Sequence, residues 1–453
     1  MYLPSLLQLQ KHKIVGVGLK FSDRTGLETI LNNYSIITTK PANWISQYPN
    51  LDKVHHLVNT SNAKTETIFL NPQITKMLHK LAITAVILYK PTPLKLNIPI
   101  LQNNYKIYKK FENKSKVRQT IPNLKFPPFE FIYLPNLIQS PLQKFKTLNS
   151  KYGKFVIQHS MLSGGRGTYI INSYQEFQNS LNNLSTQTQN NPLIISKFIQ
   201  GSSISIQACN TSNYGTLTSG IQKQIISQPE LCNTTKLGSS QFCGGQWSPN
   251  DFTKQDIQFL QNQAQVAGKI MFQYGYLGIF GIDAIKTSDN QIYIIEINAR
   301  LTDMTPILTA IQINKNTIPL QYLHILEHLQ IPYKLTTNQL DKINSINFDP
   351  PTLSYLIFYN SYAQPIKPNI IKSGIYSIQD PSAPPSKTSN HPNPLFPKLT
   401  PYQYFLYETP NPNALIKPGK RYLKMLIPTK SLNEHNQLQP EISQLITKIH
   451  NII

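Results

Sequence analysis

Acidic residues are scarce in this chain. Its 453 residues include 21 Asp plus Glu against 43 Lys plus Arg, which gives a formal charge of +22. Such an excess of cations suits nucleic acids, acidic proteins and anionic small molecules as partners. The lysines are spread along the whole chain and often alternate with Asn, Gln and Ile, so nucleic acid is the less favoured partner. Where carboxylates do gather, their grouping is informative.

Cysteine and long apolar runs are also lacking. Cys209, Cys232 and Cys243 have no CxxC spacing, so we expect reduced thiols rather than a zinc cage or a disulfide framework. No apolar run reaches about 18 residues, which argues against a membrane-spanning helix. Residues 1–13 lack a basic leader followed by a long apolar segment, so we expect a cytoplasmic protein with no membrane partner.

The length predicts more than one domain, because a single hydrophobic core rarely serves so many residues. Short apolar segments at 14–18, 36–38 and 81–89 predict strands of an α/β unit. We therefore place an N-terminal α/β domain at 1–110.

The remaining chain divides into two further predicted parts. A middle domain covers 111–330, and a C-terminal α+β extension of unassigned role covers 331–453. The extension contains a Pro-rich segment at 378–401, which is typical of an exposed loop.

Carboxylates gather in one predicted β-hairpin, whose turn lies at 288–290. If its strands pair symmetrically about the turn, Asp283 lies opposite Glu296, with the side chains about 5 Å apart. The period of two in a strand places Asn298 and Arg300 on the same face. Two carboxylates and an amide oxygen beside a guanidinium suit Mg²⁺ together with substrate phosphates.

The alternative for this hairpin is a surface turn whose polar residues simply face water. Apolar neighbours at Ile294, Ile295 and Ile297 disfavour it, as does the general scarcity of acid. We therefore interpret the acidic face as functional.

A glycine-rich loop, Ser163-Gly164-Gly165-Arg166-Gly167-Thr168, lies between predicted strands about 115 residues before Asp283. Backbone N–H groups approach an anion closely where no Cβ intervenes. A plain glycine-rich turn would look the same, and no Gly-Lys-Ser/Thr follows as in a P-loop. Its position ahead of a two-carboxylate face makes a phosphate-covering loop the better interpretation.

With these parts in this order, the sequence resembles the ATP-grasp superfamily over about residues 80–330. The segments that carry the resemblance are Glu112-Asn113-Lys114 with Ile121-Pro122, residues 154–171, residues 194–201, residues 278–283 and residues 296–300. The resemblance implies an α+β ATP-grasp fold with two α+β subdomains that clamp ATP. It also implies an N-terminal α/β pre-ATP-grasp domain and a C-terminal extension.

The resemblance assigns roles to individual residues. It places these residues around the nucleotide: Lys114, Gln158, Gly164, Gly165, Arg166, Gly167, Thr168, Ser196, Lys197, Phe198, Ile199 and Ser203. Lys114 would contact the phosphates, the glycine loop would close over them, and the 196–199 backbone would hold the adenine. Asp283, Glu296 and Asn298 would bind Mg²⁺, with Mn²⁺ as an alternative. Arg300 would be catalytic, steadying the transferred phosphate or the acyl phosphate.

Three positions depart from the family pattern. Gln158 stands where a second phosphate-binding lysine is usual, and Ser196 and Ser203 stand where glutamates near the adenine and ribose are usual. Arg166 and Lys223 are candidates for the missing positive charge.

The function implied is that of an ADP-forming carboxylate–amine ligase, which joins a small carboxylate to an amine, with a homo-oligomer compatible with this role. One alternative is a biotin-carboxylase-like enzyme, although no Ala/Val-Met-Lys-Met tetrad for biotin attachment occurs. Another is a catalytically degenerate protein that binds nucleotide or nucleic acid.

A short zinc-protease string, His324-x-x-Glu327-His328, lies on the predicted helix 320–329. Leucines at 323, 326 and 329 supply a core stripe on that helix, and no further ligand follows. We expect these polar side chains to form a solvated helical face rather than a zinc site.

Overall fold

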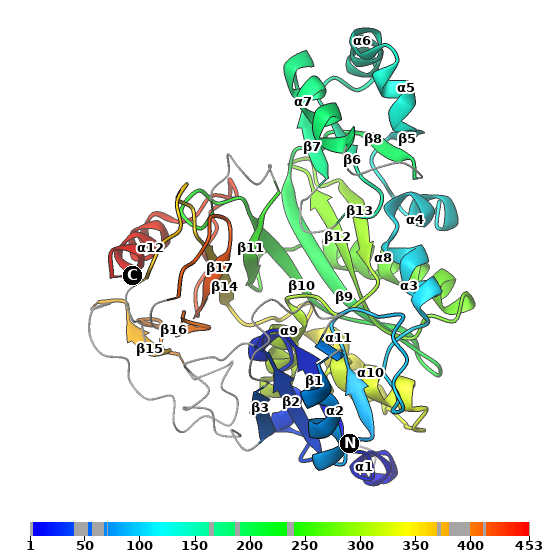
Figure 1. Ribbon diagram of the computed structural model, residues 1–453, viewed down its shortest axis with the longest axis vertical. Helices are drawn as coiled ribbons and strands as arrows, with labels where there is room; N and C mark the ends of the chain where they lie inside the picture. Colours follow the sequence, from blue (N-terminus) through cyan, green and yellow to red (C-terminus); the bar gives the residue numbers. More distant parts are fainter. Residues whose placement is uncertain are drawn as a thin grey trace.

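The computed structural model describes residues 3–39, 53–56, 68–69, 71–162, 167–185, 191–232, 240–368, 373–379, 399–410 and 414–452. In this part of the chain the strands form a parallel N-terminal sheet, a small antiparallel sheet and a large sheet between them (Figure 1). The predicted α+β architecture with an N-terminal α/β unit is confirmed.

The N-terminal sheet is parallel, in the order β3-β2-β1-β4. Its strands are β1 (Ile14–Gly18), β2 (Tyr34–Thr38), β3 (Val54–His56) and β4 (Ala85–Ile87). Its helical segments are α1 (Leu3–Gln10), η1 (Phe21–Asp23), η2 (Leu27–Thr29) and α2 (Pro72–Lys80). All five residues of β1 are buried, as expected of a parallel strand covered on both faces.

The small sheet has the strand order β5-β8-β6-β7 and lies at the top of Figure 1 with its helices. Its strands are β5 (Phe129–Ile132), β6 (Phe155–Gln158), β7 (Thr168–Ile171) and β8 (Leu193–Lys197). Its helices are α5 (Leu134–Ile138), α6 (Pro141–Tyr152) and α7 (Tyr174–Ser185). The two strands predicted to flank the glycine loop are β6 and β7, which pair with each other.

The large sheet has the order β13-β12-β9-β10-β11-β14-β17-β16-β15 in the described part of the chain. Its first five strands in sequence are β9 (Ser202–Thr211), β10 (Gly215–Ile226), β11 (Phe242–Trp247), β12 (Gly278–Lys286) and β13 (Ile292–Asn298). The others are β14 (Leu353–Tyr359), β15 (Gly374–Ser377), β16 (Gln403–Tyr407) and β17 (Arg421–Ile427). Because β14 pairs with β11, the C-terminal region continues this sheet. The domain limits at residues 110 and 330 stay predictions.

Helices cover the large sheet. They are α3 (Tyr105–Glu112), α4 (Lys114–Thr120), α8 (Lys254–Gln273), α9 (Thr305–Asn314), α10 (Leu320–Leu329), α11 (Thr337–Ser345) and α12 (Pro440–Ile452). Apolar residues of α3, α4 and α8 form one core cluster with β9, β12 and β13. Side chains alternate along these strands, so the opposite face of the same three strands is left for a site.

The expectation of a solvated face on α10 is wrong. His324 is 6% exposed, and Glu327 is buried as well. Nδ1 of His324 accepts a hydrogen bond from the Ile279 N–H at 3.2 Å, and Nε2 lies 3.3 Å from the Leu101 carbonyl oxygen. The helix is buried because it packs against β9 and β12. Among the described residues no three His, Cys, Asp or Glu side chains gather as metal ligands, which disfavours the zinc alternative.

The three cysteines are free and buried. The Cys232 thiol donates to the Gln228 carbonyl oxygen at 3.4 Å, and the Cys243 thiol donates to the Gln241 carbonyl oxygen at 3.5 Å. None of the helices in the described ranges combines the length and hydropathy needed to cross a bilayer.

Candidate active site

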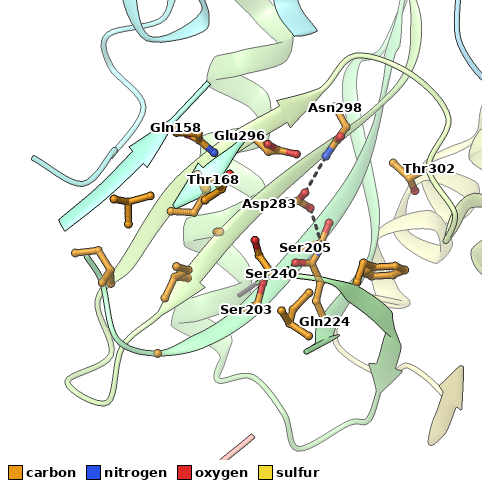
Figure 2. A pocket seen from close by; sticks show the side chains of 18 of the residues that line it. Gln158, Thr168, Ser203, Ser205, Gln224, Ser240, Asp283, Glu296, Asn298 and Thr302 are labelled. Atoms are coloured by element: carbon orange, nitrogen blue, oxygen red, sulfur yellow. Dashed lines mark hydrogen bonds between the residues drawn. The ribbon is translucent and has the colours of Figure 1, made fainter. Parts of the chain in front are cut away.

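A cavity of about 590 Å³ lies between the small sheet and the large sheet. Its volume is typical of sites for small molecules. Gln158 and Thr168 line it from β6 and β7, while Asp283 and Glu296 line it from β12 and β13, as Figure 2 shows. Arg421 also lines it, so the C-terminal region contributes to the same cavity.

The hairpin β12–β13 forms the acidic wall of this cavity. Asp283 pairs with Glu296, so the predicted opposition of the two carboxylates is confirmed. The symmetric register fails nearer the turn, where Ala284 pairs with Ile294. A β-bulge inserts Ile295 between the two registers, and both Ile295 and Glu296 then line the cavity.

Asp283 is held by two amide donors. Gln224 Nε2 donates to its Oδ1 at 2.9 Å and Asn298 Nδ2 donates to its Oδ2 at 2.8 Å, so the carboxylate lies between them (Figure 2). Burial and the facing carboxylate of Glu296 raise the pKa of Asp283 to about 6. The acidic face therefore carries repulsion that a bound cation would relieve.

Arg300 follows β13 and is tied to the same face. Its Nη2 donates to Asn298 Oδ1 at 2.8 Å, and its Nη1 donates to the Tyr89 hydroxyl at 3.2 Å. Its Nε lies 3.3 Å from a Glu112 carboxylate oxygen. Burial opposes the charge, yet Glu112, Tyr89 and Glu296 together raise the pKa of Arg300, so it remains a cation. As predicted, Asn298 and Arg300 share the face of Asp283.

Lys114 reaches the acidic face through Glu296. Its Nζ lies 3.0 Å from Glu296 Oε2 and donates to the Leu162 carbonyl oxygen at 2.7 Å. Lys114 begins α4, where Asn113 caps the helix by accepting from the backbone N–H groups of Ser115 and Lys116. The cap fixes Lys114 close to the residues that enter the glycine loop.

Part of the predicted glycine loop, Gly164, Gly165 and Arg166, lies outside the described residues. Gly167 is described and has φ +72°, and a Cβ there would lie 2.8 Å from the His159 Cβ, so this position requires glycine. Thr168 pairs with Gln158 across β6 and β7, and both line the cavity.

The predicted adenine-binding segment also faces the cavity. Ser196 and Lys197 end β8, Phe198 and Ile199 follow, and all four line the cavity. Ser203 lines it from β9 and donates its hydroxyl to Gln224 Oε1 at 2.6 Å.

Gln224 is a site residue that sequence reasoning missed. Gln222 and Gln224 line the cavity, whereas the intervening Lys223 points away and lies 3.6 Å from Asp251. Lys223 was a candidate for the missing positive charge, and strand alternation makes that candidate wrong. The alternation of Gln222 and Gln224 was a signal that could have found Gln224.

Arg118, Tyr89 and Arg421 were missed as well. Each lines the cavity. They come from α4, the N-terminal unit and β17, so no local sequence pattern joins them to the acidic hairpin.

Residues 102–304 match the family model of the ATP-grasp domain. This stretch is an ATP-grasp domain. It contains every residue of the predicted site, from Lys114 to Arg300, and lies within the range over which the sequence resembles that superfamily. No curated protein sequence matches the chain.

Solved structures share the fold of nearly the whole chain. N5-carboxyaminoimidazole synthase from Aspergillus clavatus, in complex with ADP and 5-aminoimidazole ribonucleotide, has a TM-score of 0.57 and 13% identity over 97% of this chain and 100% of that one. Biotin carboxylase from Campylobacter jejuni, in a β,γ-ATP complex, has a TM-score of 0.60 and 12% identity over 94% and 89%.

A third similar structure is the biotin carboxylase domain dimer of 2-oxoglutarate carboxylase from Hydrogenobacter thermophilus, which contains MgADP, ADP and bicarbonate. Its TM-score is 0.58, with 12% identity over 92% of this chain and 86% of that one. At these identities the likeness shows the fold.

Proposed function

We propose that this chain is an ATP-dependent ligase that activates a carboxylate as an acyl phosphate and joins it to an amine, releasing ADP and phosphate. The observation that carries the proposal is the pairing of Asp283 with Glu296, with Arg300 tied to the same face, across one cavity from the 196–199 segment. Small-molecule carboxylate and amine partners, a homo-oligomer and a cytoplasmic location belong to the same proposal.

The residues present fit a divalent cation. Asp283 and Glu296 offer hard carboxylate oxygens, and their mutual repulsion favours a cation between them. Asn298 Oδ1 accepts from Arg300 and keeps a second lone pair for the ion. Mg²⁺, or Mn²⁺ in its place, would neutralise charge on the phosphoryl oxygens when bound.

The side chains around the cavity would position the reactants for two successive steps. A substrate carboxylate oxygen attacks the γ-phosphorus of ATP, the bond to the β–γ bridging oxygen breaks, and ADP leaves. The amine nitrogen then attacks the acyl carbon, the carbon–oxygen bond to phosphate breaks, and the amine loses a proton. Arg300, which stays charged, would hold the anionic oxygens of the carboxylate and of the acyl phosphate.

Bicarbonate is a second candidate for the carboxylate. Support comes from the similar biotin carboxylase domain whose structure contains bicarbonate, and from the N5-carboxyaminoimidazole synthase neighbour. With bicarbonate as the carboxylate, the amine would become a carbamate. The absence of a biotin-attachment tetrad in the sequence makes a biotin acceptor on this chain the weaker variant of that candidate.

The test measures ADP and AMP release from Mg-ATP with pools of amino acids and small carboxylates, with and without bicarbonate. We expect ADP, and loss of its release in Glu296→Ala. AMP as product, or equal turnover by Glu296→Ala, would contradict the ligase mechanism. Release that depends on bicarbonate alone would favour the second candidate. Binding to a polyanion without ATP turnover would favour the nucleic-acid-binding alternative.

A further inference from the structure

Arg118 is a buried cation that faces the nucleotide cavity. It lies on α4 four residues after Lys114, so the two side chains project from one face of the helix. Helix α4 packs against β8 and β13, the strands that carry Ser196 and Glu296. Arg118 is only 3% exposed and lines the cavity.

Within the described part of the chain, the side chain of Arg118 contacts backbone carbonyl oxygens and aromatic rings rather than a carboxylate. Nη2 donates to the Ile295 carbonyl oxygen at 3.2 Å, and Nη1 to the Lys114 carbonyl oxygen at 3.4 Å. The guanidinium carbon lies 4.8 Å from the ring centroid of Phe126 and 5.4 Å from that of Phe129. Its Nε has no hydrogen-bond partner among the described residues.

A nearby negative charge would stabilise the guanidinium of Arg118 in this position. Burial lowers the pKa of Arg118 to about 10, and the nearby charge of Glu296 acts in the opposite direction without restoring it. Glu296 is itself paired with Lys114 at 3.0 Å. A buried cation that lacks its own counter-charge is costly, so a ligand that brings negative charge would be favoured here.

We propose that Arg118 binds the anionic part of the nucleotide and supplies the second positive charge that Gln158 does not provide. This inference rests on the proposed nucleotide site. A guanidinium fork can donate to two phosphate oxygens, and the rings of Phe126 and Phe129 keep its plane in place. A purely structural arginine would not need to combine a place at the cavity wall with a buried Nε–H that has no partner among the described residues.

The test compares the dissociation constants of ATP, ADP and adenosine by calorimetry with Mg²⁺ present. Arg118→Met should raise the dissociation constants of ATP and ADP by about 10- to 100-fold, which is the effect of losing one charge-assisted hydrogen bond. The dissociation constant of adenosine should change by less than about twofold, because adenosine carries no phosphate. Adding Gln158→Lys to Arg118→Met should restore most of the ATP affinity.

The control is Lys223→Met, which removes a cation that points away from the cavity and should leave ATP affinity unchanged. Equal ATP affinity in Arg118→Met and the unaltered protein would overturn the inference, as would an equal loss for adenosine. If Arg118→Met does not fold, Arg118→Lys serves as a second variant, because it keeps the positive charge but loses the forked donor geometry of the guanidinium. It should raise the dissociation constant of ATP by about 3- to 10-fold and leave that of adenosine unchanged. Failure of the unaltered protein to bind ATP would instead refute the proposed function.

Discussion

At the level of single residues, the ionised carboxylate of Asp283 lowers the stability of the ligand-free fold. Its carboxylate is partly buried opposite Glu296, and under the proposed function a bound cation would offset its charge. The folded-state pKa, about 6, exceeds the ordinary value of 3.8. The protonated side chain therefore stabilises the fold below about pH 3.8, and this contribution is lost as the pH rises through about 6.

We predict that Asp283→Asn stabilises the ligand-free protein at pH 8 and removes Mg²⁺-dependent ADP release. The gain should be about 1 to 3 kcal/mol, because each unit of pKa shift corresponds to about 1.4 kcal/mol and solvent reduces the full value. Urea unfolding at pH 8 measures it. At pH 4 the gain should disappear, and a variant that is destabilised at pH 8, or that keeps full activity, would refute the prediction.

At the level of secondary-structure elements, the contact between β12 and α10 depends on a glycine. Gly278 begins β12 with φ +78°, and a Cβ there would lie 2.2 Å from His324 Nδ1. That closeness lets the His324 ring accept the Ile279 N–H. The buried face of α10, which sequence periodicity alone did not reveal, follows from this packing.

We predict that Gly278→Ala costs at least about 2 kcal/mol more stability than Gly215→Ala. Both glycines have positive φ, but a Cβ at Gly215 would meet nothing within 4 Å. The Gly215→Ala variant therefore measures only the cost of placing a residue with a Cβ at positive φ. That cost alone is about 1 to 2 kcal/mol. Denaturant unfolding of both variants is the measurement, and equal losses would show that the His324 contact carries no weight.

The packing of α10 against β12 also predicts that the stability of the fold depends on pH. Burial lowers the pKa of His324 to about 4, and burial with the neighbouring His324 lowers that of His328. A depressed pKa means that stability is intact above about pH 6.5 and falls as the pH drops toward 4, because the unfolded chain takes up protons that the fold resists.

His324→Asn keeps an acceptor for the Ile279 N–H but does not titrate. We expect it to lose stability less steeply between pH 6.5 and 4 than the unaltered protein, by up to about 1.4 kcal/mol per pH unit. Thermal unfolding at half-unit intervals tests this. Parallel curves for the two proteins would assign the acid sensitivity to other groups.

At the level of the whole molecule, buried ion pairs join the N-terminal unit to the C-terminal strands. Lys424 on β17 lies 3.3 Å from Asp23 and 3.0 Å from Glu408, and it donates to Ser22 at 2.8 Å. Lys20 lies 2.6 Å from the same Glu408. Residues some 400 positions apart thus depend on each other for counter-charge.

We predict that Lys424→Met destabilises the protein by about 3 to 5 kcal/mol, since it leaves Asp23 without its lysine partner and leaves Glu408 paired with Lys20 alone. The matched control is Lys315→Met. Lys315 and Asp349 form a pair at 2.7 Å with side chains 39% and 75% exposed, and its loss should cost less than about 1 kcal/mol. Equal effects in urea unfolding would mean that the buried pairs contribute no more than a surface pair.

Local order in the sequence was sufficient for much of the site. Strand alternation and a short turn predicted that Asp283 opposes Glu296, and the order of segments predicted the ATP-grasp domain. The bulge at Ile295 was not predicted, because an inserted residue is selected by packing on neighbouring strands rather than by the turn.

Other features required distant segments to meet. The place of Arg118 beside the cavity depends on how α4 packs against β8 and β13, and the burial of His324 depends on β9, β12 and Leu101. Arg421 reaches the cavity because β14 and β17 extend the large sheet beyond the ATP-grasp domain.

The amino-acid order thus specified the acidic face and its chemistry, because pairing within a hairpin depends on a period of two and on neighbours a few residues away. That Arg118 and Arg421 line the same cavity, and which polar side chains are buried, was specified by contacts between distant segments, some of them about 400 residues apart, whose geometry no local period encodes.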